Sequence, residues 1–263
     1  MNKTIKVTLI VGAVLVGLGL IIFLVGGFLN GWQFVSTTWE DKIYESESGV
    51  EITDIDLEFA AGTLDVQFYD GDVIKVEYAE NDQFTTECEV KNTTLKITSI
   101  VRWHVQFLWF NKIPTTKVYI PQNLQLGLKL RAEAGVITVK EGTFGNVDIK
   151  MDAGTLTMDK VKCNNFVVNM DAGTMKLSKV ESNKFSAQLD AGTLNVTSLK
   201  CDNVDLELSA GSAKIGIEGK KSDYTIVADV SAGSCNVKNQ SGTTSKTLKV
   251  DVSAGSVKIS FVD

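Results

Sequence analysis

The first candidates for chemistry in this chain of 263 residues are acidic side chains that stand directly before an Ala-Gly pair at a regular spacing. They are Glu133, Asp152, Asp171 and Asp190, which follow one another at steps of 19 residues. A column of carboxylates could bridge successive repeats through Ca²⁺, but Ca²⁺ takes six to eight oxygens and one carboxylate per repeat supplies few. Asp152, Asp171 and Asp190 are therefore candidate Ca²⁺ ligands that would supply only part of the coordination shell.

The alternative for this acidic column is a turn cap, in which each side chain accepts a backbone N–H at the following corner. Further along the chain the same place is taken by Ser209, Ser231 and Ser253. Because Ser can accept the same hydrogen bond, the interchange favours capping over a metal site. We therefore expect no metal and no cofactor.

Groups for catalysis are scarce in this sequence. The single histidine, His104, lies in an aromatic run with no nucleophile nearby, which argues against a Ser-His-Asp arrangement. Glycoside hydrolysis needs two carboxylates about 5–9 Å apart in a cleft. No long inserted loop after residue 135 could form the wall of a cleft. We therefore expect that the protein is not an enzyme, and a carbohydrate-active β-helix enzyme ranks third among the functions considered.

The four cysteines are Cys88, Cys163, Cys201 and Cys235. They include no C-x-x-C pair, so a zinc site is not indicated. Cys163 and Cys201 occupy the same place two repeats apart, which corresponds to about 9.6 Å at the usual strand spacing. A disulfide needs Cα atoms within about 7 Å. We expect four free thiols.

The most aromatic segment runs from Val101 to Phe110. Its large rings are Trp103, Phe107, Trp109 and Phe110. Four consecutive apolar residues end this segment, and they cannot all face one side of a strand. Either the segment folds over the end of the core, or its rings form an exposed contact patch for a protein partner or a membrane interface.

These residues are positioned by a repeated unit with an Ala-Gly pair at its centre. The glycines are Gly62, Gly135, Gly154, Gly173, Gly192, Gly211, Gly233 and Gly255, and the last six steps are 19, 19, 19, 19, 22 and 22 residues. Self-similarity at this period indicates stacked repeats. Apolar residues alternate with polar ones on both sides of each glycine, which predicts two short strands. We interpret each glycine as a structural corner, with the small alanine before it pointing inward.

One such coil cannot bury its apolar face alone, so successive coils should stack with strands about 4.8 Å apart. The predicted fold class is all-β, a right-handed parallel β-solenoid with coils of 19–22 residues, preceded by one transmembrane helix. The chain stops halfway round a coil after Gly255. We therefore expect an unpaired strand edge there, with end-to-end self-association as one outcome.

The N-terminal segment predicts a membrane anchor. Residues 7–29 carry no charge and are long enough to span a bilayer. Lys3 and Lys6 precede the span and an acidic flank follows it, which places the N-terminus in the cytoplasm and the C-terminal domain outside a cell membrane, with the bilayer as a partner through residues 7–29. The predicted parts are residues 1–6, the cytoplasmic N-terminus; 7–29, the anchor; 30–50, a tether; 51–134, an N-terminal cap with the first strands; and 135–263, the regular repeats.

The order of these motifs resembles a bacterial β-strand-repeat family of unknown function often labelled "putative adhesin". The resemblance rests on the first Ala-Gly-Thr-Leu at 61–64, on Val-Tyr-Ile-Pro at 118–121 and on the Asp-Ala-Gly-Thr repeats. It implies a β-solenoid on a cell-envelope protein and carries over no catalytic residue.

Two functions follow from the resemblance and the repeats. The first is a non-catalytic, extracellular binding or scaffolding surface with an unknown surface ligand. The second is an accessory or sensor protein of a bacterial envelope-stress system with a membrane protein partner. The net charge of −6 argues against nucleic acid as a partner.

Overall fold

The computed structural model describes residues 38–101 and 113–262. The chain divides into two units, Met1–Thr38 and Trp39–Asp263, and every element named below lies in the second. The first strands, in chain order, are β1 (Glu40–Glu45), β2 (Asp54–Phe59), β3 (Thr63–Tyr69), β4 (Lys75–Glu80), β5 (Phe84–Lys91), β6 (Thr94–Val101), β7 (Thr115–Pro121), β8 (Gly127–Ala132) and β9 (Val136–Val139). The remaining elements are β10 (Gly142–Thr143), β11 (Asn146–Met151), β12 (Thr155–Met158), β13 (Val161–Met170), β14 (Thr174–Leu189), β15 (Thr193–Leu208), β16 (Ser212–Glu218), the 3-10 turn η1 (Lys221–Asp223), β17 (Tyr224–Cys235) and β18 (Lys246–Val262).

The repeats pair with one another at the predicted step of 19 residues. Thr155 of β12 is the ladder partner of Thr174 of β14, which in turn pairs with Thr193 of β15, and all these pairs are parallel. The parallel register puts equivalent side chains in columns, so alternation within one coil becomes an apolar column through the stack. The column four residues after each glycine is buried throughout: Val139, Met158, Leu177, Val196, Ile215, Val237 and Ile259.

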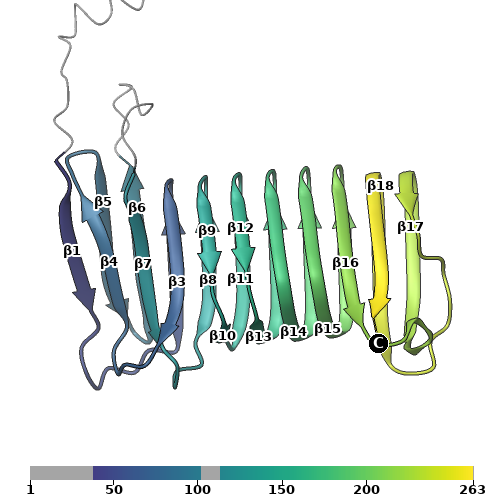
Figure 1. The fold of residues 1–263 in the computed structure, drawn as a ribbon, viewed down its shortest axis with the longest axis horizontal. Helices are drawn as coiled ribbons and strands as arrows, with labels where there is room; N and C mark the ends of the chain where they lie inside the picture. Colours follow the sequence, from purple (N-terminus) through teal and green to yellow (C-terminus); the bar gives the residue numbers. More distant parts are fainter. Residues whose placement is uncertain (1–37, 102–112, 263) are drawn as a thin grey trace, which may run out of the picture. The chain divides into compact units, whose positions relative to one another are not determined.

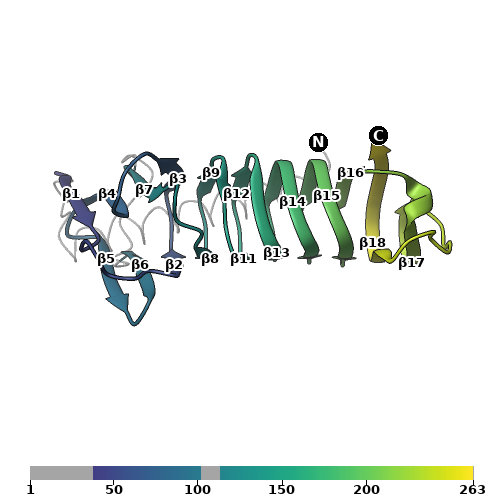
Figure 2. The same ribbon diagram turned by 90° about the horizontal axis from the view of Figure 1, so that it is seen from below.

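The two strand segments of each coil form two parallel rows. The row after the corner glycines follows the order β7, β3, β9, β12, β14, β15, β16, β18 (Figure 1). The row before them follows β6, β2, β8, β11, β13, β14, β15, β18, β17 (Figure 2). Apolar side chains from both rows meet in one core, where the rings of Phe166 and Phe185 stack with their centroids 5.3 Å apart.

The sheet as a whole is mixed, and the predicted fold class is wrong on this point. The 18 strands form one sheet in which β1–β4, β4–β7 and β5–β6 pair antiparallel. For β5–β6 the reason is local, because a short connection such as the one at Asn92, whose φ is +56°, can join only antiparallel neighbours. The β1–β4 and β4–β7 pairs join strands far apart in the chain, so they arise from long-range pairing. The β5–β6 hairpin itself was predicted and is confirmed. The structure is therefore an all-β mixed sheet and not a wholly parallel β-solenoid.

The membrane localisation also needs correction. Residues 7–29 lie outside the described residues, and in the part of the chain that is described no helix is both long enough and apolar enough to cross a bilayer. The transmembrane helix of the predicted fold class and the single-pass localisation with a cytoplasmic N-terminus are thus not supported, and we take neither further. Residues 30–50, expected as a tether, include β1, which pairs with β4.

Each coil contacts the previous one most closely at its corner glycine. The φ angles of the eight corner glycines lie between 113° and 141°, a range that L side chains rarely adopt. A Cβ added to Gly173 would lie closer than 3.0 Å to the carbonyl oxygen of Gly154. That oxygen accepts the N–H of Thr174 at 2.9 Å. Glycine is therefore required twice here, for the backbone angle and for the close approach.

The alanines before the corner glycines do not point inward as predicted. Ala172 and most of its equivalents are exposed. The corner is closed by backbone hydrogen bonds to the previous coil, such as Ala172 N–H to the Asp152 oxygen at 3.0 Å. A small residue at this place therefore packs no core, and the apolar columns resume only after the corner.

The coils at the C-terminal end are not stacked in chain order. β18 lies between β16 and β17 (Figure 1), so the coil that contains Gly255 has a neighbour on both sides. The predicted unpaired edge at the last coil is therefore wrong, because the edge strand is β17.

The chain that follows β17 covers much of this edge. Gln240 exchanges two backbone hydrogen bonds with Ile226, at 2.9 and 3.0 Å, and Asn239 Oδ1 accepts a backbone N–H of β17 at 2.6 Å. Where β17 has ended, the Asn236 amide donates to the Ile259 carbonyl and accepts the Ile259 N–H, both at 2.7 Å. Asn236 thus replaces a missing strand with its side chain, and such covering keeps other strands from adding to the edge.

The first prediction separates close packing from backbone strain at the corners. Gly219 also has a positive φ, +114°, but an added Cβ there meets nothing within 4 Å. Gly219→Ala should therefore lower the free energy of unfolding by about 1–2 kcal/mol through backbone strain alone. Gly173→Ala should lower it by at least about 2 kcal/mol more, because the methyl group pushes two coils apart. Equal losses in chemical denaturation would show that the contact between glycines is not limiting.

The second prediction concerns the covered edge. The double variant Asn236→Ala/Asn239→Ala removes both side-chain caps, so its sedimentation coefficient should rise with protein concentration as exposed edges pair. Asn195→Ala is the matched control, because Asn195 stands three residues after Gly192 as Asn236 does after Gly233, and it is exposed on an inner coil. The capping role is refuted if the double variant and the control sediment alike at every concentration.

Candidate functional site

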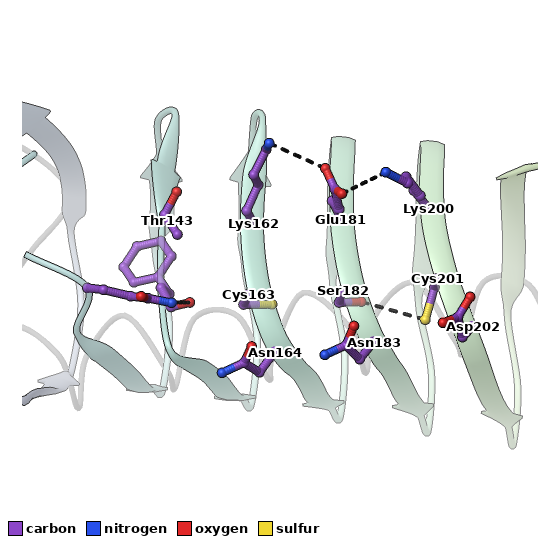
Figure 3. Close-up of a pocket in the computed structure, with 12 residues that line it drawn as sticks. Thr143, Lys162, Cys163, Asn164, Glu181, Ser182, Asn183, Lys200, Cys201 and Asp202 are labelled. Atoms are coloured by element: carbon purple, nitrogen blue, oxygen red, sulfur yellow. Dashed lines mark hydrogen bonds and ion pairs between the residues drawn. The ribbon is translucent and has the colours of Figure 1, made fainter.

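A shallow groove of about 260 Å³ lies where three successive coils turn from one strand row toward the other. We call it the coil groove. Three rows line it, each with one residue from β13, β14 and β15: the charged row Lys162, Glu181, Lys200; the floor row Cys163, Ser182, Cys201; and the amide row Asn164, Asn183, Asp202 (Figure 3).

The groove exists because its floor row is made of small residues. Gly142 and Thr143 of β10 pair with Val161 and Lys162, so the neighbouring coil places Phe144 beside Cys163. The Phe144 ring is fully buried and fills this column, whereas cysteine and serine leave it hollow. The groove therefore results from the difference in volume between the Phe144 side chain and the smaller side chains of the same column.

The open side of the groove follows from a break in the strand alternation. Val161 is buried, Lys162 is exposed and Cys163 is half-buried, but Asn164 and Asn165 are both exposed. Two consecutive outward residues bend the strand, as in a bulge. The same pair of polar residues recurs at 183–184 and 202–203, so each coil presents one extra polar side chain at the groove.

The charged row is linked by ion pairs. Glu181 contacts Lys200 Nζ at 2.8 Å and Lys162 Nζ at 3.4 Å (Figure 3). The hydrogen bond from Lys200 lowers the pKa of the Glu181 carboxyl, partial burial opposes this, and the charge of Lys162 adds to the lowering. The same hydrogen bond raises the pKa of Lys200. Glu181 and Lys200 are therefore both charged at neutral pH, and the Glu181 carboxylate lies between the two lysine side chains.

The thiols of the floor row are protonated at neutral pH. Burial raises the pKa of Cys163 to about 12, with a smaller contribution from Cys201. Burial also raises the pKa of Cys201, against the effect of the hydrogen bond from Ser182 Oγ to its Sγ at 3.6 Å. The four cysteines are free, as expected. Ser182 pairs with both Cys163 and Cys201 in the ladder, which keeps the two thiols two strands apart.

The amide row holds the groups with the most unused hydrogen-bonding capacity. In the part of the chain that the structure describes, the side-chain amides of Asn164 and Asn183 have no hydrogen-bond partner. Both side chains lie beside the floor row in Figure 3. Asp202, the third member, forms an ion pair with Lys246 at 3.3 Å.

The acidic column singled out in the sequence lies at the corners, away from the coil groove. Asp152, Asp171 and Asp190 are exposed, and the corner N–H groups donate to carbonyls of the previous coil and not to these carboxylates. Asp190 Oδ1 accepts a hydrogen bond from Ser209 at 3.4 Å. Among the described residues no group of three or more His, Cys, Asp or Glu side chains could hold a metal ion. The capping explanation is thus wrong, and the column tolerates Asp or Ser because its side chains point to solvent.

The aromatic candidates Trp103, Phe107, Trp109 and Phe110 lie outside the described residues, as does His104. Sequence reasoning missed the coil groove. The available signal was the place nine residues after each corner glycine, which reads Phe144, Cys163, Ser182, Cys201 and so changes abruptly in size. The polar pairs that begin at Asn164, Asn183 and Asp202 were the second signal.

Comparisons with known proteins give one family and several structures. The family described as Toastrack DUF4097 matches residues 52–263, which confirms the resemblance drawn from the Ala-Gly motifs. No curated protein matches the chain. A "putative cell adhesion protein" from Clostridium sporogenes is 18% identical over 86% of this chain and 100% of its own, with a TM-score of 0.47. A "putative adhesin" from Bacteroides fragilis is 16% identical over 85% and 98%, with a TM-score of 0.38. With both scores below 0.5, we base no argument on these structures.

The raised pKa of Cys163 leads to a reactivity prediction. Iodoacetamide labelling of this thiol, followed by peptide mass spectrometry, should continue to accelerate up to about pH 12 in the folded protein. In the unfolded protein the rate should level off near the ordinary thiol pKa of 9.0. At pH 8 the folded rate should be lower by about three orders of magnitude, since the thiolate is the nucleophile. A folded-state rate that levels off near pH 9 would contradict the burial of this thiol.

Proposed function

We propose that this chain, which belongs to the Toastrack DUF4097 family, is a non-catalytic binding module that holds its ligand in the coil groove. It is adhesin-like in the limited sense that it recognises a ligand without converting it. The observation that carries the proposal is the pair of unpartnered amides, Asn164 and Asn183, which successive coils present to the same open groove.

The backbone that carries these side chains supports a binding role. β13, β14 and β15 pair in register over Val161, Val180 and Leu199, so the walls of the groove stand on sheet and not on loops. These three side chains are fully buried beneath it. A site whose backbone is fixed before the ligand arrives loses little conformational entropy on binding.

The electrostatics of the groove support the absence of catalysis. General acid–base catalysis works best with a group whose pKa lies near the operating pH. In the groove the pKa values are shifted away from neutral pH. Lys200 lowers the pKa of Glu181, and Glu181 raises the pKa of Lys200. Burial raises the pKa of Cys163 to about 12. Each group is thus held in one protonation state, which suits recognition better than proton transfer.

Arrays of immobilised glycans and peptides test the proposal. For an array ligand that the wild-type protein binds, the double variant Asn164→Ala/Asn183→Ala should have an affinity at least about tenfold lower. The reason is that two hydrogen bonds of about 1 kcal/mol each are lost. Asn195→Ala, which changes an exposed Asn on the other strand row, should bind as wild type does. Mass spectrometry of the bound ligand should show no change in mass.

Two results would overturn this function. Equal binding by the double variant and the control would place the site elsewhere on the molecule. A ligand whose mass changes during incubation with the wild type, but not with the double variant, would make the groove an active site.

A further inference from the structure

We propose that the coil groove takes an uncharged sugar unit of an extended glycan chain that runs along the stack of coils. This inference rests on the proposed function and adds the chemical class of the ligand. It follows from the size of the groove, from the pairing of its charges and from the hydrogen-bonding groups that remain free.

The size of the groove limits what it can hold. Pockets that enclose a drug-sized ligand usually measure about 300–1,000 Å³. The coil groove measures about 260 Å³ and is open along one side. It therefore suits one ring-sized unit of a longer chain, with the neighbouring units resting on the surface of adjacent coils.

The charges of the groove favour an uncharged ligand. Glu181 is already paired with both Lys162 and Lys200, and Asp202 is paired with Lys246. A ligand carboxylate or phosphate would compete with Glu181 or Asp202 for these lysines, and a cationic ligand would compete with the lysines for the carboxylates. A ligand without charge leaves these partly exposed pairs intact, so it avoids the modest cost of separating them.

The free hydrogen-bonding groups match hydroxyl groups. The amides of Asn164 and Asn183 each offer N–H donors and a carbonyl acceptor, and a sugar hydroxyl can both donate and accept. Gln125, at the end of the groove, donates one N–H to the Phe144 carbonyl at 3.4 Å, and its side-chain oxygen accepts no hydrogen bond from the described residues. The groove thus offers both donors and acceptors to the hydroxyl groups of a sugar.

A peptide ligand fits these features less well. Peptides that bind sheets usually add a strand to a free edge. At this place β13 and β14 are paired on both sides. On its far side β15 is paired up to Leu199 and again from Asn203, and between them the Cys201 carbonyl accepts the Tyr224 hydroxyl at 2.6 Å. The floor row of cysteines and serine is too shallow to form a deep apolar pocket for an anchoring side chain. The three rows of the groove repeat from coil to coil at about 4.8 Å. A ligand that contacts the same row on successive coils therefore runs along the stack.

The test is isothermal titration calorimetry of the full chain with defined probes. The neutral probes are oligomers of glucose and of N-acetylglucosamine, the anionic probe is an oligogalacturonate, and the peptide probes are one basic and one acidic decapeptide. The double variant Asn164→Leu/Asn183→Leu removes the amides from exposed positions, and Asn195→Leu is its control. Cys163→Leu is a further variant that fills the floor and leaves the amides in place.

We expect a neutral oligosaccharide to bind the wild type and the control equally, with affinity falling at least tenfold in the amide variant and in Cys163→Leu. Unchanged thermal unfolding would show that the amide variant is folded. A different result would be that only the oligogalacturonate or a peptide binds, and that the groove variants abolish this binding. The assignment to an uncharged sugar would then be wrong, while the proposed binding function would stand. If no neutral probe binds at about 10 mM, or if binding is unaffected by the groove variants, the assignment is also wrong.

Discussion

The structure depends on the contact between one corner glycine and the next. At each corner, the glycine carbonyl accepts an N–H from the following coil, and the following glycine lies where any side chain would collide with that same oxygen. This backbone hydrogen bond recurs at the carbonyls from Gly135 to Gly192 with distances of 2.9 Å, and at the Gly211 carbonyl with 3.0 Å. It fixes the spacing and the register between neighbouring coils, and therefore aligns all other columns of side chains. A change of one methyl group at a corner acts on two coils at once.

The columns that result have different consequences on the inside and at the turns. Inside, the register brings like residues together, as with the stacked rings of Phe166 and Phe185. At the turn between the strand rows, the same register stacks residues of unequal volume, and the small floor residues beside Phe144 leave the coil groove. A regular repeat thus produces a local groove without any inserted loop. The opposite requirement holds at the end of the stack, where Asn236 and Gln240 cover strand edges that regular repetition would leave open.

The sequence predicted the local organisation well. The period of 19 residues, the paired strands around each Ala-Gly and the buried column that includes Met158 and Leu177 all follow from composition at fixed spacing, because alternation along a strand directly reflects which face is buried. The hairpin of β5 and β6 was predicted for the same reason. Neither the antiparallel pairs of β1 and β4 nor the placement of β18 before β17 was predicted, because which coil becomes whose neighbour depends on long-range pairing that spacing does not encode.

The candidate site could be predicted only in part. The acidic column indicated a possible metal site because carboxylates are common metal ligands. In the structure its side chains point to solvent, and the corners are closed by backbone hydrogen bonds. The groove depends on the volume of Cys163 relative to Phe144, a difference that means little until the register places the two side by side. The amides of Asn164 and Asn183 become a pair only through the same register.

A preformed groove of the kind proposed above should bind its ligand without rearrangement of the coils. Two-dimensional ¹H–¹⁵N NMR of the full chain, recorded with and without a neutral N-acetylglucosamine oligomer, tests it most directly. Shift changes should be confined to residues 162–164, 181–183 and 200–202 with their side-chain amides, while the corner amides of Thr155, Thr174 and Thr193 keep their positions. Changes centred on the corners or on the edge strand β17, with the groove signals unmoved, would contradict it.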